Sequence, residues 1–296
     1  MEFLSVAEVA KKWNISDRMV RNYCANGRIE GAFLTGKTWN IPAYAHKPLN
    51  IKEESCGNDL LAILKREKDT SLTGGIYHKT QIELTYNSNH IEGSTLTHDQ
   101  TRYIFETSTI GVESGSALNV DDIVETANHF KCVDYIIDNA TKPISETMIK
   151  KLHFILKNGT SDSRKSWFNV GEYKKLPNEV GFEETCKPEK VKTEIKKFLD
   201  NYNSLKDKTF EQILQFHKDF ESIHPFQDGN GRVGRLLMFK ECLANNIVPF
   251  IIDEYHKLFY YRGLKEWKTE KGYLIDTCLS CQDKYKSWLD YFQIKY

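Results

Sequence analysis

The sequence predicts a mainly α-helical protein in which a small N-terminal domain precedes a larger helical domain. Apolar residues recur at helical spacing through most of the chain after Asp59, whereas residues 3–44 have the pattern of two short helices and a hairpin. The 296 residues carry a formal net charge of zero, with 40% hydrophobic and 28% charged residues. This balance is typical of a soluble globular protein with a sizeable core.

Residues 1–48 predict a winged helix-turn-helix domain. Ser5 can cap a first helix and Ser16 can cap a second one. The stretch from Ile29 to Ile41 alternates loosely around Gly36, which predicts a hairpin. On the second helix, the side chains that we expect to face outward and contact DNA are those of Arg18, Arg21 and Asn22.

The charge of this first domain favours a nucleic-acid partner. Seven Lys and Arg against four Asp and Glu give residues 1–48 a net charge of +3 (7 − 4), which suits contact with a phosphate backbone. The arrangement resembles the excisionase-like and MerR-like DNA-binding modules. A docking module without DNA binding fits the same residues, because a fold does not fix a function, and both interpretations stay open.

A polar linker over residues 49–58 leads into a helical domain over residues 59–296. Its helices are predicted from apolar spacing, from Ser and Thr caps, and from Gly or Pro at their ends. The clearest ones are expected over residues 97–107, 120–140, 145–157, 188–202, 210–223, 233–245, 254–267 and 273–292.

The seven cysteines are scattered and odd in number, which suits reduced thiols in a cytoplasmic protein. Cys278 and Cys281 form a single C-x-x-C without a second pair, so packing on a helix face is expected rather than metal or redox chemistry. The sequence shows no signal-peptide pattern and no run near the ~20 apolar residues that span a bilayer. We therefore expect a cytoplasmic protein that is not associated with a membrane.

The stretch from His224 to Arg235 has the parts of a phosphate site in a loop between two helices. Pro225 disfavours helix at the residue before it. Gly229 and Gly231 lack side chains, so backbone N–H groups can close on an anion where the next helix begins. The two cations that would face this anion share one helix face: Arg232 and Arg235.

Two other residues of this stretch supply chemistry. Asp228 is a hard oxygen ligand, and Mg²⁺ usually takes one or two carboxylates and completes its shell with phosphate and water. His224 is the only group there that accepts a proton near neutral pH. These are the parts that phosphoryl or nucleotidyl transfer requires. A Walker P-loop is absent because no lysine follows the glycines, and a plain interhelical turn is the structural alternative.

The string resembles the Fic-domain signature H-P-F-x-[DE]-G-N-G-R-x-x-R at every fixed position. The resemblance implies a Fic helical core, with His224 as the base that deprotonates a target hydroxyl and Asp228 as the Mg²⁺ ligand. Gly231 argues against the kinase branch of the family, which has a lysine there. The residues that the resemblance places around the ATP phosphates are Asp228, Gly229, Asn230, Gly231, Arg232, Val233, Gly234 and Arg235.

A second informative stretch lies near residues 85–93. Gly93 is expected to end a helix, so Glu92 lies on the last turn, where the dipole disfavours a carboxylate and a cation should pair with it. Ser88 to Gly93 resembles the Fic inhibitory motif [ST]-x-x-x-E-[GN]. The resemblance implies that Glu92 pairs with Arg235 and blocks productive seating of the γ-phosphate. An exposed glutamate at a helix end is the alternative.

Residues 167–182 predict two short extended arms around Pro177 and Asn178. The stretch resembles the β-hairpin flap of Fic proteins, whose strand edge pairs with the main chain of a target. A plain surface hairpin is the alternative. The resemblance also places four flap residues and one tyrosine around the nucleotide: Asn178, Glu179, Val180, Gly181 and, beside the adenine, Tyr260.

The implied activity is transfer of AMP from ATP to a Ser, Thr or Tyr hydroxyl of a target protein, or of the chain itself, with Mg²⁺ and with inhibition by Glu92. Two alternatives stay open. One is removal of AMP from a modified protein, and the other is a DNA-binding regulator that uses the Fic core as a sensor. A homo-oligomer is compatible with the sequence.

Overall fold

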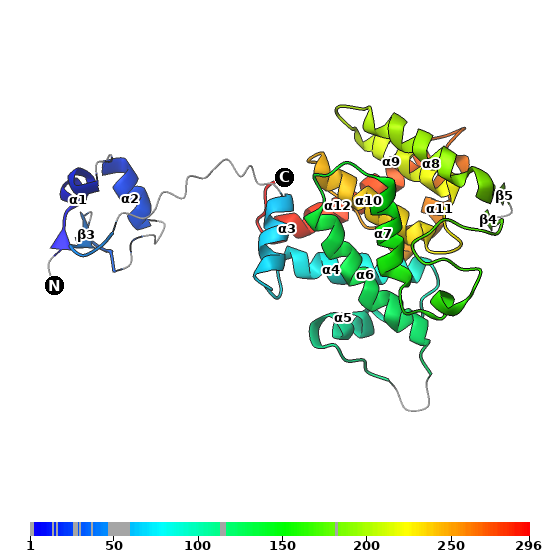
Figure 1. The fold of residues 1–296 in the computed structure, drawn as a ribbon. Coiled ribbons are helices and arrows are strands. Elements are labelled where there is room, and N and C mark those ends of the chain that lie inside the picture. The colour runs from blue at the N-terminus through cyan, green and yellow to red at the C-terminus, as the bar shows by residue number, and fades with distance from the viewer. Residues whose placement is uncertain are drawn as a thin grey trace. The chain divides into compact units, whose positions relative to one another are not determined.

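The structure is a computed structural model that describes residues 3–13, 15, 17–25, 29, 31–36, 38–46, 60–112, 117–180 and 183–296. The chain forms two compact units, Met1–Gly57 and Asn58–Tyr296 (Figure 1). Within the described ranges, none of the helices combines the length and the apolar character needed to cross a membrane.

The smaller unit combines two short helices with a three-stranded antiparallel sheet. Helix α1 packs on strand β3, and the strand order is β1-β3-β2. Its core consists of Val6, Val9, Ala10, Trp13, Val20, Tyr23, Cys24, Ile29 and Ile41. The bounds are β1 (Phe3–Leu4), α1 (Val6–Trp13), α2 (Asp17–Ala25), β2 (Phe33–Thr35) and β3 (Thr38–Pro42).

Of the residues predicted to contact DNA, Arg21 is exposed on α2. Arg18 and Asn22 belong to the same helix, but their side chains lie outside the described part of the structure.

The larger unit is helical apart from one short hairpin. Its α-helices are α3 (Leu60–Asp69), α4 (Ile76–Ile91), α5 (His98–Thr107), α6 (Val120–Asp138), α7 (Glu146–Lys157), α8 (Pro188–Asn203), α9 (Phe210–Ile223), α10 (Asn230–Ala244), α11 (Lys257–Glu266) and α12 (Gly272–Tyr291). The hairpin pairs β4 (Glu179–Val180) with β5 (Glu183–Glu184). Two 3₁₀ turns complete it, η1 (Ser161–Arg164) and η2 (Glu254–His256).

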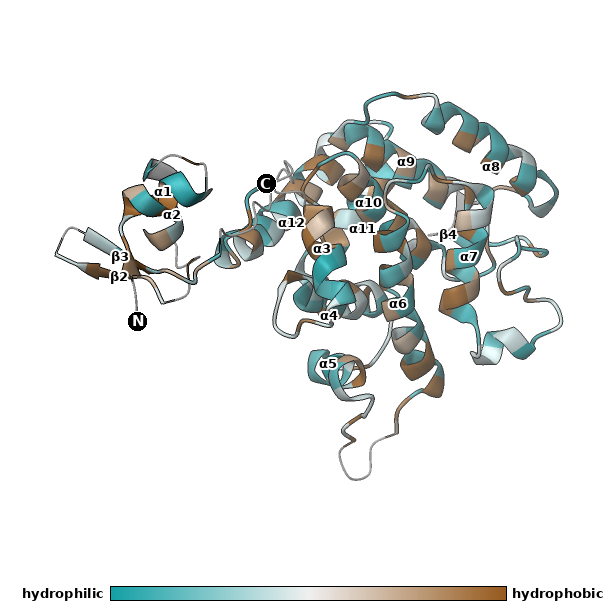
Figure 2. Cartoon of the chain, turned by 60° about the vertical axis from the view of Figure 1, so that its left-hand side comes forward, coloured by the Kyte–Doolittle hydropathy of each residue, from teal (hydrophilic) through white to brown (hydrophobic). Residues whose placement is uncertain are grey.

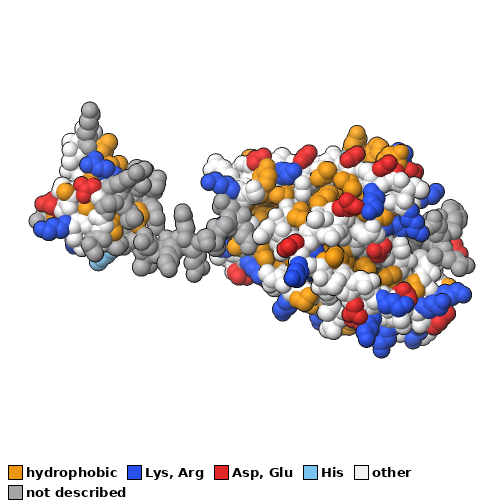
Figure 3. Space-filling view, turned by 90° about the horizontal axis from the view of Figure 1, so that it is seen from above, with side chains coloured by type: hydrophobic (Ala, Val, Ile, Leu, Met, Phe, Trp, Pro, Cys, Tyr) orange, Lys and Arg blue, Asp and Glu red, His pale blue; other side chains and the backbone are white. Residues whose placement is uncertain are grey.

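Helix α10 is the central element of this unit. It contacts α3, α4, α6, α7 and α9, and every side chain from Arg232 to Leu243 is buried (Figure 1). By contrast, the outer helix α8 is mostly hydrophilic, with hydrophobic residues on its inward face (Figure 2). Acidic and basic side chains are interspersed over the face in Figure 3, as expected for a chain with no net charge.

Most predicted helices are confirmed to within a few residues, and their ends have the expected causes. Thr97 caps α5 in a capping box with Gln100, and Ser145 caps α7 by accepting a hydrogen bond from Met148 N. Cys278 and Cys281 are both buried in the hydrophobic core, as expected.

Three boundaries were predicted wrongly. Helix α10 begins at Asn230 rather than at Val233, because the left-handed Gly229 (φ +80°) already ends the loop. The hairpin follows Pro177 and Asn178 instead of forming around them, so these two residues precede its first strand. The helix expected over 254–267 divides into η2 and α11.

The crossing of α11 and α12 provides a test of the packing. A Cβ atom on Gly263 would lie 2.6 Å from Leu274 Cα, a backbone atom that cannot move aside. We expect Gly263→Ala to lower the free energy of unfolding by about 1–3 kcal/mol, measured by urea denaturation. Gly272→Ala is the matched control, because its Cβ would meet only the flexible end of Glu270. Equal urea midpoints for the two variants would contradict this packing.

Candidate active site

The candidate base lies where α9 ends. His224 takes up a left-handed conformation (φ +50°), and its N–H donates to Phe220 O at 2.9 Å. Pro225 follows, and the helix stops at Ile223 as predicted. A left-handed conformation is uncommon for a residue other than glycine, and such strain concentrates at functional sites.

The tautomer of His224 follows from its contacts. Its Nδ1 lies 3.3 Å from the carbonyl oxygen of Glu221, which can only accept, so Nδ1 carries the hydrogen. Nε2 then has the free lone pair. Burial, together with the nearby Lys174 ammonium, lowers the pKa of His224 to about 4. The imidazole is therefore neutral at pH 7 and able to accept a proton.

The loop after His224 is held together from inside. The Asn230 side chain accepts from Phe226 N at 2.8 Å and donates to Phe226 O at 2.9 Å. The Phe226 ring stacks on His153 of α7, with ring centroids 3.9 Å apart and planes 2° apart. His153 Nε2 in turn lies 3.1 Å from Asp228 O. These contacts fix the backbone that leads into the N-terminus of α10.

The glycines of this region fit close contacts. A Cβ on Gly231 would collide with Glu92 Oε1, and one on Gly234 would lie 2.9 Å from His217 and Glu221 of α9. Val233 is fully buried in the core. The described structure therefore leaves Gly229, Asn230 and Gly231 as the turn whose backbone N–H groups could face an anion.

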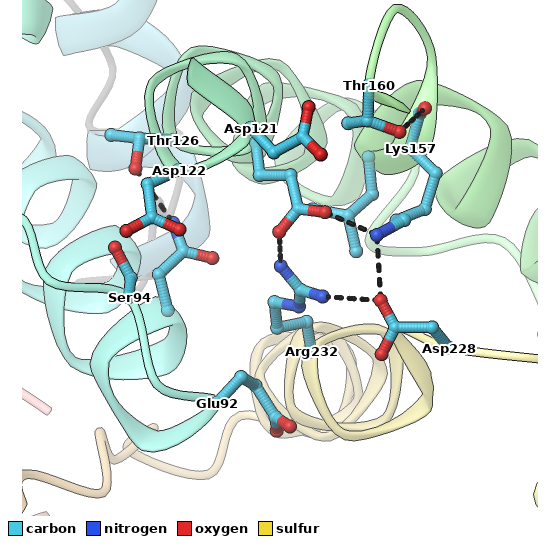
Figure 4. Close-up of polar contacts among 12 residues, drawn as sticks. Glu92, Ser94, Asp121, Asp122, Thr126, Lys157, Thr160, Asp228 and Arg232 are labelled. Atoms are coloured by element: carbon cyan, nitrogen blue, oxygen red, sulfur yellow. Dashed lines mark hydrogen bonds and ion pairs between the residues drawn. The ribbon is translucent and has the colours of Figure 1, made fainter. Parts of the chain in front are cut away.

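Asp228 belongs to an ion network that the sequence did not reveal, in which it contacts Lys157 and Arg232 (Figure 4). Its Oδ2 accepts from Lys157 Nζ at 2.7 Å and from Arg232 Nη2 at 3.2 Å. Glu125 of α6 pairs with both of these cations. Burial acts to raise the pKa of Asp228, but Arg232 and Lys157 outweigh it and hold the pKa well below its usual range.

Lys157 is surrounded by acids. Its Nζ is 2.7 Å from both Asp162 and Asp228 and also contacts Glu125, while its side chain is only 3% exposed. Burial alone would lower the pKa of Lys157, but Asp228 and Glu125 raise it to about 12. Lys157 is thus a permanent cation at neutral pH.

Mg²⁺ fits one position in this network. Oxygens of Glu125, Asp162 and Asp228 lie within 4.8 Å of one another, but the Lys157 ammonium already contacts all three acids. Asp228 is the ionised member whose side chain is half exposed, at 48%. A single accessible carboxylate, completed by substrate phosphates and water, is the protein contribution that Mg²⁺ normally needs.

The second arginine of α10 pairs with the predicted glutamate. Arg235 Nη2 lies 2.6 Å from Glu92 Oε1, at the C-terminal end of α4. Arg235 also donates to Ser88, through Nε to Oγ at 3.1 Å and through Nη2 to the carbonyl oxygen at 2.9 Å. The contact predicted from residues 88–93 is thus confirmed, and Gly93 (φ +98°) ends the helix as expected.

Helix α9 also carries the polar side chains of Glu221 and His217, which precede His224. Glu221 Oε2 is 3.8 Å from His224 Nδ1, and no hydrogen-bond partner is found for its Oε1 in the described structure. Burial and then the neighbouring Glu92 raise the pKa of Glu221 to about 7.

His217 Nε2 lies 2.6 Å from the hydroxyl of Tyr260. Tyr260 is only 1% exposed, and its placement beside adenine stays a prediction.

The predicted flap residues are described in part. Asn178 donates to Phe226 O at 3.0 Å, so it lies against the motif loop, and Glu179 is exposed at the start of β4. The side chain of Val180 and all of Gly181 lie outside the described residues.

Sequence reasoning missed three residues that hold this site: Glu125, His153 and Lys157. A signal for two of them existed, because His153 and Lys157 are polar residues four apart in a helix whose neighbouring positions Ile149, Leu152 and Leu156 are apolar and buried. Nothing in the sequence near Glu125 indicated its partners, which are 32 and 107 residues away.

The Lys157 network predicts a large loss of stability when the cation is removed. Lys157→Met leaves three carboxylates close together without their shared cation, so we expect the free energy of unfolding to fall by about 3–5 kcal/mol at pH 7. Millimolar Mg²⁺ should recover part of this loss. Lys165→Met is the control, because its pair with Asp162 is more exposed and should contribute less than about 1 kcal/mol. Similar losses in the two variants, measured by urea denaturation, would show that the network contributes little.

Comparison with known proteins matches part of the chain to one family. Residues 143–242 match the sequence model of the Fic/DOC family. The chain is similar to "Protein adenylyltransferase Fic" of Drosophila grimshawi, with 28% identity over 212 residues, covering 69% of this chain and 40% of the relative. The corresponding protein of Aedes aegypti is 30% identical over 193 residues, covering 62% of this chain and 36% of the relative. The chain thus spans well under half the length of these curated relatives.

The fold of this chain is similar to those of solved structures of Fic proteins. A Fic domain containing signaling protein from Bacteroides thetaiotaomicron superimposes with a TM-score of 0.58 and 26% identity, covering 78% of this chain and 90% of that chain. Fic-1 from C. elegans gives a TM-score of 0.61 over 81% of this chain and 74% of that chain, and its 18% identity supports the fold alone. The segment that carries the motif loop and its flanking helices, residues 143–242, is the part of the chain that matches the Fic/DOC family.

Proposed function

We propose that this chain is a protein adenylyltransferase, which moves AMP from ATP to a Ser, Thr or Tyr hydroxyl of a protein. One observation supports this most strongly: a neutral His224 with a free Nε2 stands next to a helix N-terminus that carries two arginines. The similarity to proteins named protein adenylyltransferase Fic points the same way.

In this reaction His224 Nε2 takes the proton of the target hydroxyl as its oxygen attacks the α-phosphorus, and pyrophosphate leaves. The N–H groups at the start of α10, with Arg232 and Arg235, bind the phosphate oxygens. Asp228 would hold Mg²⁺, which supplies charge neutralisation at the phosphates when it is bound. The flap hairpin would offer a strand edge to the main chain of the target, which would align a hydroxyl without requiring a particular sequence.

We further propose that Glu92 inhibits this reaction. Its carboxylate occupies Arg235 in the described structure and approaches the backbone of Gly231 closely. A phosphate group that needs Arg235 has to displace Glu92 first. At an effective dielectric of 20, such a pair gains up to about 4 kcal/mol before desolvation is subtracted, which is enough to keep most molecules inactive.

The first test is incubation with ATP labelled on the α-phosphate. Glu92→Gly should transfer label to protein at least tenfold faster than the parent, because Arg235 becomes free for phosphate. Adding His224→Ala to that variant should reduce transfer by about 10²–10⁴-fold, because the base is lost. Glu254→Gly is the control, since the ion pairs of this exposed glutamate in the described structure are with His90 and Lys257 rather than with an arginine of α10. Equal labelling of the parent and Glu92→Gly would reject the inhibitory role.

Removal of AMP is the second candidate reaction of the same site. This reaction is favoured over transfer if activity requires Glu92 in its present position close to Gly231. A Glu92→Gly variant that loses the ability to release AMP from a modified protein, and transfers no label, would identify this direction.

We also propose that the smaller unit binds DNA. The supporting observation is the order of its elements, two short helices followed by a hairpin, with Arg21 exposed on the second helix. Binding of the full chain to labelled duplex DNA should weaken steeply with salt. Arg21→Ala should weaken it severalfold, whereas Arg262→Ala, an exposed arginine on α11, should not. DNA binding that depends on neither the salt concentration nor Arg21 would contradict this proposal. The smaller unit would then be interpreted as a protein-docking module.

A further inference from the structure

A buried lysine connects the flap to the loop that carries the base. Lys174 is only 5% exposed. Its Nζ donates to Asn178 Oδ1 and to Thr185 Oγ1, at 2.6 Å each, and lies 3.5 Å from Ile223 O. Its backbone N–H donates to Pro225 O at 2.9 Å. One residue therefore contacts both ends of the flap and both neighbours of His224.

The flap needs such an anchor because its own pairing is short. Strands β4 and β5 contain two residues each, and a two-stranded ribbon of this size has little stability alone. Asn178 precedes β4 and Thr185 follows β5, and the Thr185 hydroxyl also donates to the main-chain oxygen of Asn178 at 2.9 Å. Lys174 thus closes the base of the hairpin by bonding to a residue on each side.

Within the part of the chain that the structure describes, the charge of Lys174 is not neutralised by an ion pair. Among the side chains that the structure describes, no carboxylate lies within ion-pair distance of its Nζ, and all three of its acceptors are neutral oxygens. Burial lowers the pKa of Lys174 to about 8, so the ammonium form still predominates at pH 7. An unpaired buried cation acts on its neighbours with little screening.

The neighbour that this cation affects is His224. The other titratable groups around the imidazole are Glu221, Glu92 and Asp228, while Cys186 lies near Lys174 itself. A positive charge disfavours the imidazolium form, in the same direction as burial. This explains why the pKa of His224 is low although Glu92 and Asp228 act to raise it.

We propose that Lys174 is a positioning residue with two tasks: its hydrogen bonds hold the flap against the base-bearing loop, and its charge adds to burial in disfavouring protonation of His224. This inference rests on the proposed role of His224 as the base. A target strand on the flap would then be aligned with an imidazole whose lone pair is available even in mildly acidic conditions.

The test is the titration of His224 by NMR in the full chain, with its signals assigned by their loss in His224→Ala. Lys174→Met should raise the pKa of His224 by about one unit, a tenfold gain in proton affinity, because the cation is removed while the site stays buried. Lys174→Arg should restore the low value. Lys175→Met is the matched control, an adjacent but exposed lysine, and should leave the titration unchanged.

A second variant separates the two tasks. Thr185→Val removes one acceptor but keeps the charge, so it should increase amide exchange over the described flap residues 175–180 at least tenfold without moving the His224 titration. Lys174→Met should increase both the amide exchange of the flap and the pKa of His224. Lys174→Gln is the replacement for Lys174→Met if that variant does not fold.

The outcomes are distinct. An unchanged His224 titration in Lys174→Met and Lys174→Gln overturns the electrostatic task, as does an equal shift in Thr185→Val or Lys175→Met. Unchanged flap exchange in both Lys174→Met and Thr185→Val overturns the anchoring task. Because neither measurement requires turnover, a failure of the proposed transfer reaction would not be mistaken for a failure of this inference.

Discussion

The structure of the larger unit depends on two guanidinium groups buried in its central helix. Arg232 and Arg235 are each 4% exposed, on a helix that neighbouring helices surround. A buried charge without a partner costs several kcal/mol, so each arginine needs a carboxylate from another element. Arg232 has Glu125 and Asp228, and Arg235 has Glu92. These pairs fix α4, α6 and the motif loop around α10.

The same requirement limits how the proposed phosphate site could be occupied. In the absence of phosphate, the arginines are neutralised by carboxylates of the chain, and an incoming triphosphate can replace only those carboxylates that are able to leave. Glu125 is mostly buried, with 12% of its side chain exposed, and is held by two cations. Glu92 has 29% exposure, a single ion-pair partner in the described structure, and a place at the end of its helix. Under the proposed function, Glu92 is therefore the carboxylate that a phosphate would displace more readily, and Arg235 is the arginine that would become available.

Much of this arrangement could be predicted from local sequence. Caps such as Thr97 with Gln100 and stops such as Pro225 act over a few residues, so the helix boundaries near them were predicted correctly. A cation beside Glu92 was predicted because a carboxylate at a helix C-terminus is unfavourable by itself, and the resemblance to the inhibitory motif implied that this cation is Arg235. Contacts set by the tertiary fold were not predictable in this way. Lys157 and Asp228 are 71 residues apart and meet only because α7 packs beside α10.

The early start of α10 shows how a local signal can be weighted wrongly. Gly229 and Gly231 were expected to lie in the loop and Gly234 in the helix after it, but of these three only Gly229 has a left-handed backbone. The other two are helical, and glycine is needed there because Glu92 and the side chains of α9 come too close for a Cβ atom. The sequence alone does not show whether a glycine is required by a left-handed backbone or by the close approach of a neighbouring side chain.

The proposed base and the proposed inhibitory contact are connected through Glu221. Glu92 is the second cause, after burial, of the raised pKa of Glu221, whose carboxyl group faces Nδ1 of His224. Arg235 acts in the opposite direction on Glu221, so the pKa of this carboxyl group depends on which anion lies beside Arg235. In its ionised form Glu221 would stabilise an imidazolium at His224, whereas the Lys174 ammonium would destabilise it. Under the proposed function, the anion that pairs with Arg235 therefore also acts, through Glu221, on the proton affinity of His224.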